Sequence, residues 1–259
     1  MAAGTALVTG ASAGIGREFC RQLASRGYDL ILVARDAERL DALAAELSAA
    51  HAVAALPLPA DLSRDGDVDR VVARIQGTPA LALLINNAGF GTVGSFADGD
   101  PTVQERMVRV HVLAPMRLVR AALPGMIEQR RGGIVNVSSI ASFVYAAGSV
   151  NYCATKAYLT VFTEGLATEL KGTGVQVQAL CPGFTMSEFH QRMGPGAGDH
   201  RRFMWMTAES VVRASLAQLD RQGAVVCVPG LRYRLIVALI RILPPRVLGL
   251  VTGRTSRRV

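Results

Sequence analysis

The stretch Ala6-Leu7-Val8-Thr9-Gly10-Ala11-Ser12-Ala13-Gly14-Ile15-Gly16 is an apolar run followed by a glycine-rich turn. An amphipathic segment begins at Arg17, so the pattern predicts a strand, a turn and a helix. In that arrangement a pyrophosphate binds at the helix N-terminus, where unpaired backbone N–H groups point. Gly10 permits the turn, Gly14 lets phosphates approach the backbone, and Gly16 lets the helix pack on the strand. The glycine spacing differs by one residue from the commoner dinucleotide pattern, and an ordinary glycine turn remains the alternative.

The alternation of strand and helix continues along the chain. We expect strands at about 5–9, 28–34, 53–58, 81–86, 132–138, 175–181 and 224–228, and helices at about 14–26, 36–50, 64–76, 102–130, 151–171 and 208–221. Apolar strands such as Leu30-Ile31-Leu32-Val33 suit a parallel sheet that is covered on both faces. The predicted fold is therefore α/β: a single-domain, Rossmann-type, doubly wound parallel sheet flanked by helices on both faces. Its ligand crevice is expected at the carboxyl ends of the strands.

Composition agrees with one large domain. A chain of 259 residues can bury a sizeable core, and a hydrophobic content of 50% excludes a disordered chain. We expect residues 1–230 to form the nucleotide-binding and catalytic domain and residues 231–259 to be its basic, apolar extension. The four cysteines are scattered and form no C-x-x-C pair, which predicts reduced thiols. The first strand begins too early for a secretory signal, so a cytoplasmic protein is expected.

A second informative segment lies in the helix expected at 151–171. Tyr152 and Lys156 are four residues apart and therefore lie on the same helix face. A free phenol has a pKa of ~10, and an ammonium group one turn away should lower that pKa toward the range useful for proton transfer. Ser139, thirteen residues before the tyrosine, supplies a hydroxyl that can hold a substrate oxygen. These three side chains predict oxidation of an alcohol or reduction of a ketone.

Five motifs occur in the order and spacing of the short-chain dehydrogenase/reductase family, which the chain resembles over roughly residues 5–230. They are Thr9-Gly10-x-x-x-Gly14-Ile15-Gly16, Asn86-Asn87-Ala88-Gly89, Ser139, Tyr152-x-x-x-Lys156 and Pro182-Gly183. The resemblance implies that Tyr152 is the general acid or base, that Lys156 lowers its pKa and binds the nicotinamide ribose, and that Ser139 holds the carbonyl oxygen. It also implies a homo-oligomer, either a dimer or a tetramer.

The end of the second predicted strand indicates which nicotinamide cofactor binds. NAD-dependent relatives carry an acidic side chain there for the ribose 2′-hydroxyl, whereas this chain has Ala34 followed by Arg35. A guanidinium can bond a 2′-phosphate that a carboxylate would repel, so NADP(H) is the predicted cofactor. Asp36 comes next, and we interpret it as a helix cap that points away. Asp61-Leu62 resembles the family's adenine contact, and a loop cap is an almost equal alternative for this aspartate.

The resemblance extends the predicted cofactor site to several loops. The predicted contacts are Gly10, Ser12, Ala13, Gly14, Ile15, Gly16, Arg35, Asp61, Leu62, Asn87, Ala88, Gly89, Tyr152, Lys156, Pro182, Gly183, Thr185 and Ser187. Thr185 and Ser187 compete for one of these contacts, with the nicotinamide amide, and Ser187 matches the usual spacing better.

One position departs from the family's pattern. Many members have an asparagine in the long helix before the fifth strand, and its backbone carbonyl holds a water joined to the lysine. Here His111 stands in that place. If only the carbonyl matters, the substitution is tolerated. Alternatively the imidazole, with a reference pKa of ~6.5, shuttles protons itself, so His111 is a fourth candidate catalytic residue. The other histidines form no ligand cluster, and no metal site is predicted.

Residues 184–206 are predicted to form a variable lid over the substrate. The lid is rich in methionine and aromatic residues, which line adaptable apolar pockets. The candidate substrate contacts are Phe184, Phe189 and Trp205, beside Ser139 and Tyr152. A small hydrophobic carbonyl or alcohol substrate, such as a long-chain ketone, a 3-oxoacyl derivative or a steroid-like molecule, is favoured over a sugar. Packing of these side chains between lid and body is an equal alternative.

The net charge of +8 is concentrated near the C-terminus. Residues 231–259 contain seven arginines and no acidic residue, which leaves 21 basic and 20 acidic residues in the rest of the chain. The apolar run at 235–240 is too short to span a bilayer, but it suits a peripheral contact with anionic lipids at the inner membrane surface. Packing on its own subunit or on a neighbouring one is the alternative. Nucleic-acid binding is not expected, because Tyr233 is the only aromatic residue among the arginines.

The sequence thus predicts an NADP-dependent oxidoreductase that interconverts a ketone and a secondary alcohol on a hydrophobic substrate. The rival hypothesis is a non-catalytic or weakly active NADP-sensing or scaffold protein of the same fold. The intact set of Ser139, Tyr152 and Lys156 argues against the rival, and only His111 favours it.

Overall fold

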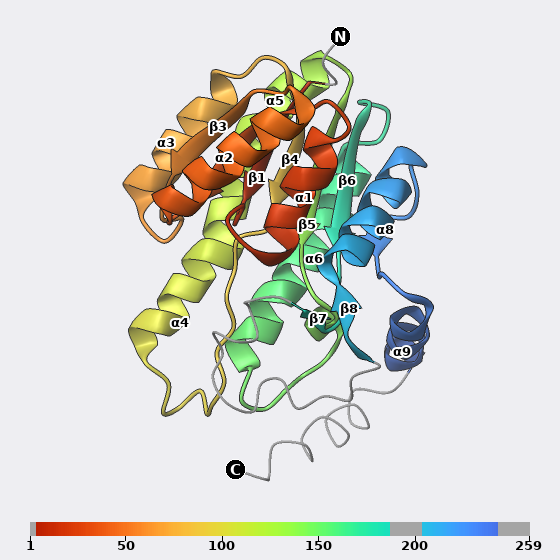
Figure 1. Cartoon of the computed structure of the whole chain (residues 1–259). Coiled ribbons are helices and arrows are strands. Elements are labelled where there is room, and N and C mark those ends of the chain that lie inside the picture. Colours follow the sequence, from red (N-terminus) through yellow and green to blue (C-terminus); the bar gives the residue numbers. More distant parts are fainter. Residues whose placement is uncertain (1–3, 187–203, 243–259) are drawn as a thin grey trace.

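The computed structural model describes residues 4–186 and 204–242 of the chain. Its centre is a seven-stranded sheet in which every pairing is parallel (Figure 1). The strands are β1 (Thr5–Thr9), β2 (Asp29–Ala34), β3 (Ala55–Pro59), β4 (Leu81–Asn86), β5 (Gly132–Val137), β6 (Val175–Leu180) and β9 (Val226–Cys227). Their order in the sheet is β3-β2-β1-β4-β5-β6-β9. The chain builds the sheet outward from β1 to β3 on one side and from β4 to β9 on the other, so the order of connection switches between β1 and β4. This order confirms the predicted doubly wound sheet.

Helices connect the strands and cover both faces of the sheet (Figure 1). They are α1 (Gly14–Ala24), α2 (Ala37–His51), α3 (Asp65–Gln76), α4 (Pro101–Val108), α5 (Ala114–Glu128), α6 (Val150–Glu169), α8 (Ala208–Asp220) and α9 (Leu231–Ile242). A π-helix η1 (Arg109–Leu113) joins α4 to α5, and a short 3-10 helix η2 (Ile140–Phe143) follows β5. Two short strands, β7 (Thr185–Met186) and β8 (Met206–Thr207), pair separately from the main sheet.

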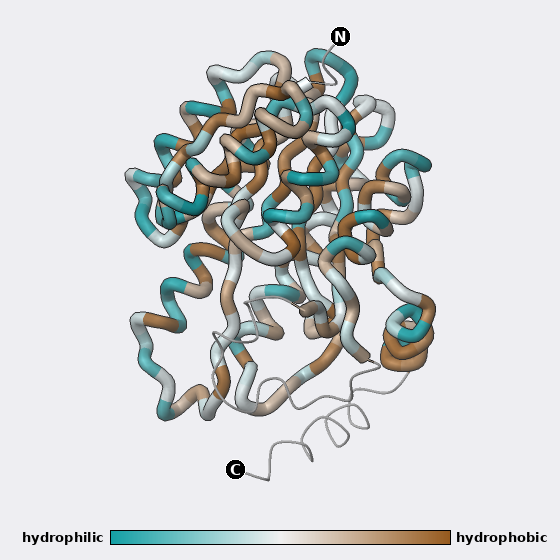
Figure 2. Tube along the Cα trace, in the orientation of Figure 1, coloured by the Kyte–Doolittle hydropathy of each residue, from teal (hydrophilic) through white to brown (hydrophobic). Residues whose placement is uncertain are grey.

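Alternating side chains along each strand supply the two layers of the core. Ala6 and Val8 of β1 pack in the layer that includes α1, α2 and α8, whereas Leu7 packs in the layer with α3, α5 and α6. The period of two follows from the pleat of a strand. Hydrophobic segments accordingly run through the centre of the molecule, and hydrophilic ones lie mainly on its outer turns (Figure 2).

The helix expected at 102–130 is interrupted by the π-helix. In η1 the Ala114 N–H bonds the carbonyl of Arg109, five residues back rather than four. Pro115 follows at once and has no N–H to offer the carbonyl of His111, its ordinary helical partner. A proline one turn after His111 therefore gives a physical reason for irregular bonding at this point, and π-bulges are common at functional sites.

The α4–η1–α5 segment is also the one helix among the described residues that is long and apolar enough to cross a membrane. Its inner side chains, including Leu118, Val119 and Met126, are nevertheless buried in the core layer with α3. Core helices of globular domains pass the same test of length and composition. We therefore interpret the segment as a core helix.

Helix α9 is an element that we did not predict. Its Tyr233 and Val237 are buried in a third hydrophobic cluster with Ala179, Cys181 and Val228. The beginning of the basic C-terminal extension thus packs on the end of β6 and the residues after β9. Residues 243–259 lie outside the described part of the chain.

Candidate active site

The predicted site residues follow four strands that are neighbours in the sheet. Gly10 comes after β1, Asn87 after β4, Ser139 two residues after β5, and Pro182 two residues after β6. Parallel strands have their carboxyl ends on one edge of the sheet, so these turns gather at that edge. The sheet therefore brings together motifs that are more than 170 residues apart in the sequence.

The glycine turn requires glycine at two positions. Gly10 has a φ of +67°, and a Cβ at Gly16 would lie 2.2 Å from the Gly10 carbonyl oxygen and 2.4 Å from Asn87 Nδ2. No side chain fits in that space, so α1 can start this close to the turn only with glycine. Asn87 Nδ2 donates to the carbonyl oxygens of Thr9 and Gly10, at 2.9 and 3.3 Å. The turns after β1 and β4 are thereby fixed together.

The start of α1 fits the phosphates of a dinucleotide. Ala13 precedes the helix in an extended conformation and provides no side-chain cap, and the first turn holds no acidic residue. The first N–H groups of a helix have no partner within it, and the helix dipole makes this end positive. Together with the small side chains of the turn, these features are those of a pyrophosphate site.

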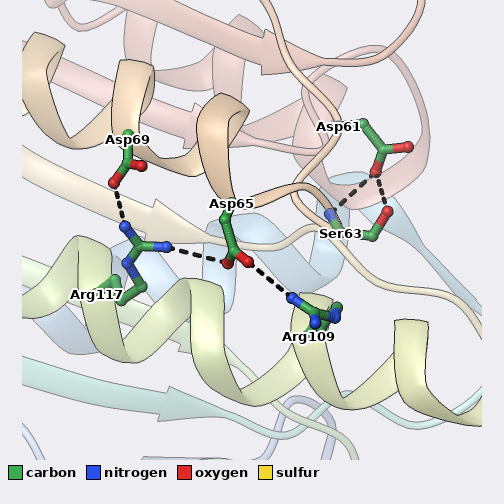
Figure 3. A network of polar contacts seen from close by, with 6 residues as sticks. All are labelled: Asp61, Ser63, Asp65, Asp69, Arg109 and Arg117. Atoms are coloured by element: carbon green, nitrogen blue, oxygen red, sulfur yellow. Dashed lines mark hydrogen bonds and ion pairs between the residues drawn. The ribbon is translucent and has the colours of Figure 1, made fainter.

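Arg35 follows β2, and two acidic residues of the same region are engaged elsewhere. Asp36 caps α2, as predicted, and its Oδ1 accepts a hydrogen bond from the Arg39 N–H at 3.1 Å. Asp61 Oδ1 accepts from the N–H and the hydroxyl of Ser63, at 3.0 and 2.8 Å (Figure 3). Burial pushes the pKa of Asp61 up, but these bonds and the charge of Arg35 outweigh it and hold the pKa below its ordinary value. The adenine contact proposed for Asp61 and Leu62 stays a prediction.

Ser139, Tyr152 and Lys156 lie together at the carboxyl edge. Ser139 caps η2, where its Oγ accepts from the Ala141 N–H at 3.1 Å, and it hydrogen-bonds Tyr152. On α6, Lys156 is only 4% exposed, and its Nζ lies 5.8 Å from the centre of the Tyr152 ring. That Nζ donates to the Val137 carbonyl at 2.9 Å, at the end of β5. The geometry brings the three predicted residues into one cluster.

Burial dominates the proton affinities in this cluster. It raises the pKa of Tyr152 from 10.0 to about 12, although the hydrogen bond with Ser139 acts in the opposite direction. It lowers the pKa of Lys156 from 10.5 to about 8. Our expectation that Lys156 lowers the phenol pKa stays a prediction: in the chain by itself loss of solvation dominates this pKa, and the Lys156 charge is not among the causes of its shift. A phenol with this pKa stays protonated at neutral pH, as a proton donor must.

His111 is buried, and its two ring nitrogens have separate partners. Nε2 accepts from the Phe90 N–H at 3.0 Å, so the proton is assigned to Nδ1, which lies 3.0 Å from Thr155 Oγ1. Thr155 in turn donates to the Tyr152 backbone carbonyl at 3.0 Å. Burial and then the Lys156 charge hold the pKa of His111 well below 6.5. The imidazole is therefore neutral and connects the turn after β4 to the helix that carries Tyr152.

The surroundings of His111 agree with a fixed position. A Cβ at Gly89 would lie 2.8 Å from His111 Nε2, so glycine is needed there. Ion pairs between α3 and the η1–α5 segment join Asp65 to Arg109 and Arg117, at 3.1 and 3.3 Å (Figure 3). The Asp65 side chain is 70% exposed, and ion pairs so open to water contribute little. The buried hydrogen bonds of the imidazole are thus the stronger restraint.

Tyr233 of α9 packs against the segment that follows β6 and hydrogen-bonds it. A Cβ at Gly183 would lie 2.1 Å from the Tyr233 ring, so the ring packs directly on this glycine. The Tyr233 hydroxyl accepts from the Phe184 N–H at 3.0 Å and donates to the Met204 carbonyl at 2.6 Å. It therefore joins the two ends of residues 184–204.

Part of the predicted lid can be described. Thr185 is buried and donates from Oγ1 to the Gly183 carbonyl at 3.0 Å. The rings of Phe184 and Trp205 are 5.9 Å apart, and their predicted contact with the substrate stays a prediction. Ser187 and Phe189 lie outside the described residues, so the competition between Thr185 and Ser187 stays open.

Sequence reasoning missed two residues that belong to this site. Thr155 lies between the two predicted residues of α6, and its role shows only through its contact with His111. Tyr233 is the only aromatic residue of the C-terminal extension, and its role shows only through its contacts with Gly183, Phe184 and Met204. Within residues 4–186 and 204–242 no three His, Cys, Asp or Glu side chains are placed to hold a metal ion. The absence of a metal site stays a prediction.

Comparison with known proteins adds independent evidence. The family model described as short chain dehydrogenase matches residues 4–197. The chain belongs to the short-chain dehydrogenase family. Membership confirms the resemblance stated from the motifs and makes the protein an oxidoreductase by class.

Individual members of the family are similar over most of this chain. A very-long-chain 3-oxoacyl-CoA reductase of Anas platyrhynchos is 30% identical over 84% of this chain and 69% of its own length. A short chain dehydrogenase of Pseudocercospora fijiensis is 37% identical over 71% of this chain. The match spans 60% of the fungal protein, so this chain corresponds to less than two thirds of that relative. The solved structure of a short-chain dehydrogenase from Sphingobium yanoikuyae in complex with NADPH is 35% identical, with a TM-score of 0.84 over 93% of this chain and 96% of its own.

Proposed function

We propose that this short-chain dehydrogenase is an NADP(H)-dependent reductase of apolar ketones, acting through Tyr152. The observation that carries the proposal is the cluster in which Ser139 bonds the Tyr152 hydroxyl and Lys156 lies buried beside the ring. Arg35 after the non-acidic Ala34, and a similar structure that contains NADPH, support the choice of cofactor. The similar 3-oxoacyl-CoA reductase supports an apolar carbonyl substrate.

In the proposed reaction the protein positions the carbonyl and supplies a proton. NADPH, when bound, supplies the hydride for the carbonyl carbon. The Ser139 hydroxyl holds the carbonyl oxygen, and the Tyr152 hydroxyl donates its proton to that oxygen, so that the hydride and the proton together give the secondary alcohol. Lys156 would hold the nicotinamide ribose and, as a cation, stabilise the tyrosinate left behind. In the direction of alcohol oxidation the tyrosinate takes the proton back.

The experiment that tests this proposal is an assay of the purified chain with NADPH and ketones of graded chain length. Burial of each methylene contributes about 0.8 kcal/mol, so kcat/KM should rise about fourfold per carbon while the chain still fits the site. A keto sugar is the matched polar control and should react slowly. Values of kcat/KM that do not change with chain length would contradict the proposal of an apolar substrate. No consumption of NADPH with any ketone would contradict the proposed reaction itself.

His111 is proposed to act as a positioning residue rather than as a proton relay. Replacing it by Leu, which can neither accept nor donate, should lower turnover, because the Phe90 N–H loses its acceptor and the Thr155 hydroxyl keeps only the Tyr152 carbonyl as a partner. Loss of such hydrogen bonds costs about 1–3 kcal/mol of unfolding free energy, which a thermal melt detects. Because the imidazole stays neutral, the pH–rate profile between pH ~5 and ~8 should keep its shape in the variant. A limb that disappears on substitution would show instead that His111 titrates during the reaction.

Tyr233 is proposed to hold the base of the substrate site. Tyr233→Phe keeps the ring on Gly183 but removes the hydroxyl that joins Phe184 to Met204. Two backbone groups then lose a partner, so KM for the ketone should rise several-fold, while kcat and NADPH affinity change less. Tyr28→Phe, before β2 at the amino edge of the sheet, is the control. Equal KM values in both variants would refute this role.

We also propose a homo-oligomer that works in the cytoplasm, with a peripheral membrane contact. Exposed apolar side chains on α5 and α6 support a contact between copies: Met116 is 38%, Tyr158 38% and Val161 66% exposed. Size-exclusion chromatography with light scattering would give the number of copies in the oligomer, and a monomer would contradict the proposed contact. The membrane contact is developed below.

A further inference from the structure

One face of α9 carries a stripe of exposed apolar side chains. Leu231, Leu235, Leu239 and Ile242 are 70%, 63%, 61% and 81% exposed. Their spacing of four, four and three residues puts them on one side of a helix with 3.6 residues per turn. The opposite side holds Tyr233, which is buried in the protein. Four large apolar side chains in one row on a surface helix mark an interaction site.

Arginine side chains border this stripe on both sides. By the same helical spacing, Arg234 and Arg241 lie along one border and Arg232 along the other. Arg234 Nε donates to the Val228 carbonyl at 3.0 Å, and Arg241 lies 3.8 Å from Glu164. Arg241 also lies over the Phe143 ring, 4.9 Å from its centre, and its ion pair with Glu164 is long and half-exposed, so that pair is weak in water.

We propose that α9 docks flat on an anionic lipid surface, with the stripe in the acyl boundary and the arginines at the headgroups. The charge decides the occupant: α9 carries Arg232, Arg234 and Arg241 and no acidic residue. A second copy placed on the same face would bring arginine against arginine, whereas anionic lipids neutralise them. Arginine stems can cover apolar surface while their heads reach the phosphates.

The length of α9 determines how it meets the bilayer. Twelve residues make a helix of about 18 Å, while the hydrocarbon core is about 30 Å thick. The helix is therefore too short to cross and lies in the interface, as amphipathic helices with a basic border do.

Docking through α9 would bring lipid close to the substrate site. Tyr233, on the inner side of the same helix, bonds both Phe184 and Met204, next to Trp205. An apolar ketone dissolved in the bilayer then has a short path to the site. This second part rests on the proposed function, whereas docking itself does not.

Co-sedimentation of the full-length chain with phosphatidylcholine vesicles, with and without phosphatidylserine, tests the docking. We expect binding to the phosphatidylserine vesicles that weakens when salt is raised to about 1 M, where the Debye length is ~3 Å. The double variant Leu235→Gln, Leu239→Gln should bind at least roughly tenfold more weakly, because two apolar contacts are lost. Ile127→Gln, an apolar residue of α5 that is 40% exposed, is the matched control and should bind as the wild type does.

Each other outcome overturns the docking. No sedimentation of the wild type, or equal binding by the double variant, rules out the stripe as a lipid contact. A double variant that loses oligomers or melts at a lower temperature, with no effect of vesicles, assigns the stripe to a second copy or to the chain itself. Truncation after Gly230 is not a fair test, since it also removes the buried Tyr233 and Val237.

A separate assay judges the link to the substrate. Wild type and double variant should reduce a water-soluble ketone equally, while only the wild type should gain rate when a long-chain ketone is supplied in phosphatidylserine vesicles. If the rates of the wild type and the double variant rise equally, the proposal that α9 delivers the ketone from the bilayer is wrong. If neither reduces any ketone, the proposed function fails, and the sedimentation result still decides the docking.

Discussion

Turnover of the Tyr152→Phe variant should fall by at least the ~100-fold typical of lost general acid–base catalysis. The substitution removes the hydroxyl that bonds Ser139 and keeps the ring beside Lys156. The ring and the packing of α6 are retained, so affinity for NADPH should change little. Initial rates of ketone reduction, with cofactor affinity from NADPH fluorescence, measure the two effects separately.

The same helix provides a matched control for this substitution. Tyr158, which is 38% exposed, stacks on Phe162 with ring centres 5.7 Å apart. Tyr158→Phe makes the same chemical change six residues further on, and it should react at the wild-type rate. Near-normal turnover of Tyr152→Phe would mean that another group donates the proton.

Arg35→Ala should remove most of the preference for NADPH over NADH. Loss of a charge-assisted hydrogen bond costs about 1.5–3 kcal/mol, so NADPH should bind roughly 10- to 100-fold more weakly while NADH affinity stays the same. The neighbouring Asp36 caps α2. Its Oδ1 accepts from the Arg39 N–H and its Oδ2 lies 3.3 Å from Arg39 Nε, so both carboxylate oxygens are engaged and neither is left to favour the 2′-hydroxyl of NADH. Fluorescence titration with both cofactors gives the four affinities.

Arg74, in the last turn of α3, is the control for Arg35. The last turn of a crossover helix lies at the amino edge of the sheet, away from the candidate site. Arg74→Ala should therefore leave both affinities unchanged. Equal binding of NADPH and NADH by the wild type would contradict the assignment of the cofactor.

Local patterns predicted the sheet because each pattern has a direct physical cause. Continuous apolar strands such as β2 are buried on both faces, and glycines such as Gly16 stand where no Cβ fits. The carboxyl-edge site could be predicted with them, because topology places the ends of parallel strands together. Tyr152 and Lys156 could be paired from helical spacing alone.

Features that depend on contacts between distant segments could not be predicted. The neutral state of His111 is set by burial and by the Lys156 charge, and its tautomer by Phe90 and Thr155, all of which act only in the folded chain. The pKa of Tyr152 is set by burial, which spacing does not reveal. Helix α9 in the arginine-rich extension could not be predicted either, because its buried side packs on Gly183 and other residues that are distant in the sequence.

The most direct test of the central claim is the reaction of the wild-type chain with NADPH and a long-chain ketone, with the product identified. A reductase through Tyr152 predicts that one NADPH is consumed for each secondary alcohol formed, and that Tyr152→Phe binds NADPH but forms almost none. An NADP-sensing or scaffold protein predicts binding of NADPH without ketone-dependent consumption. That second result, across a full series of apolar ketones, would contradict the account.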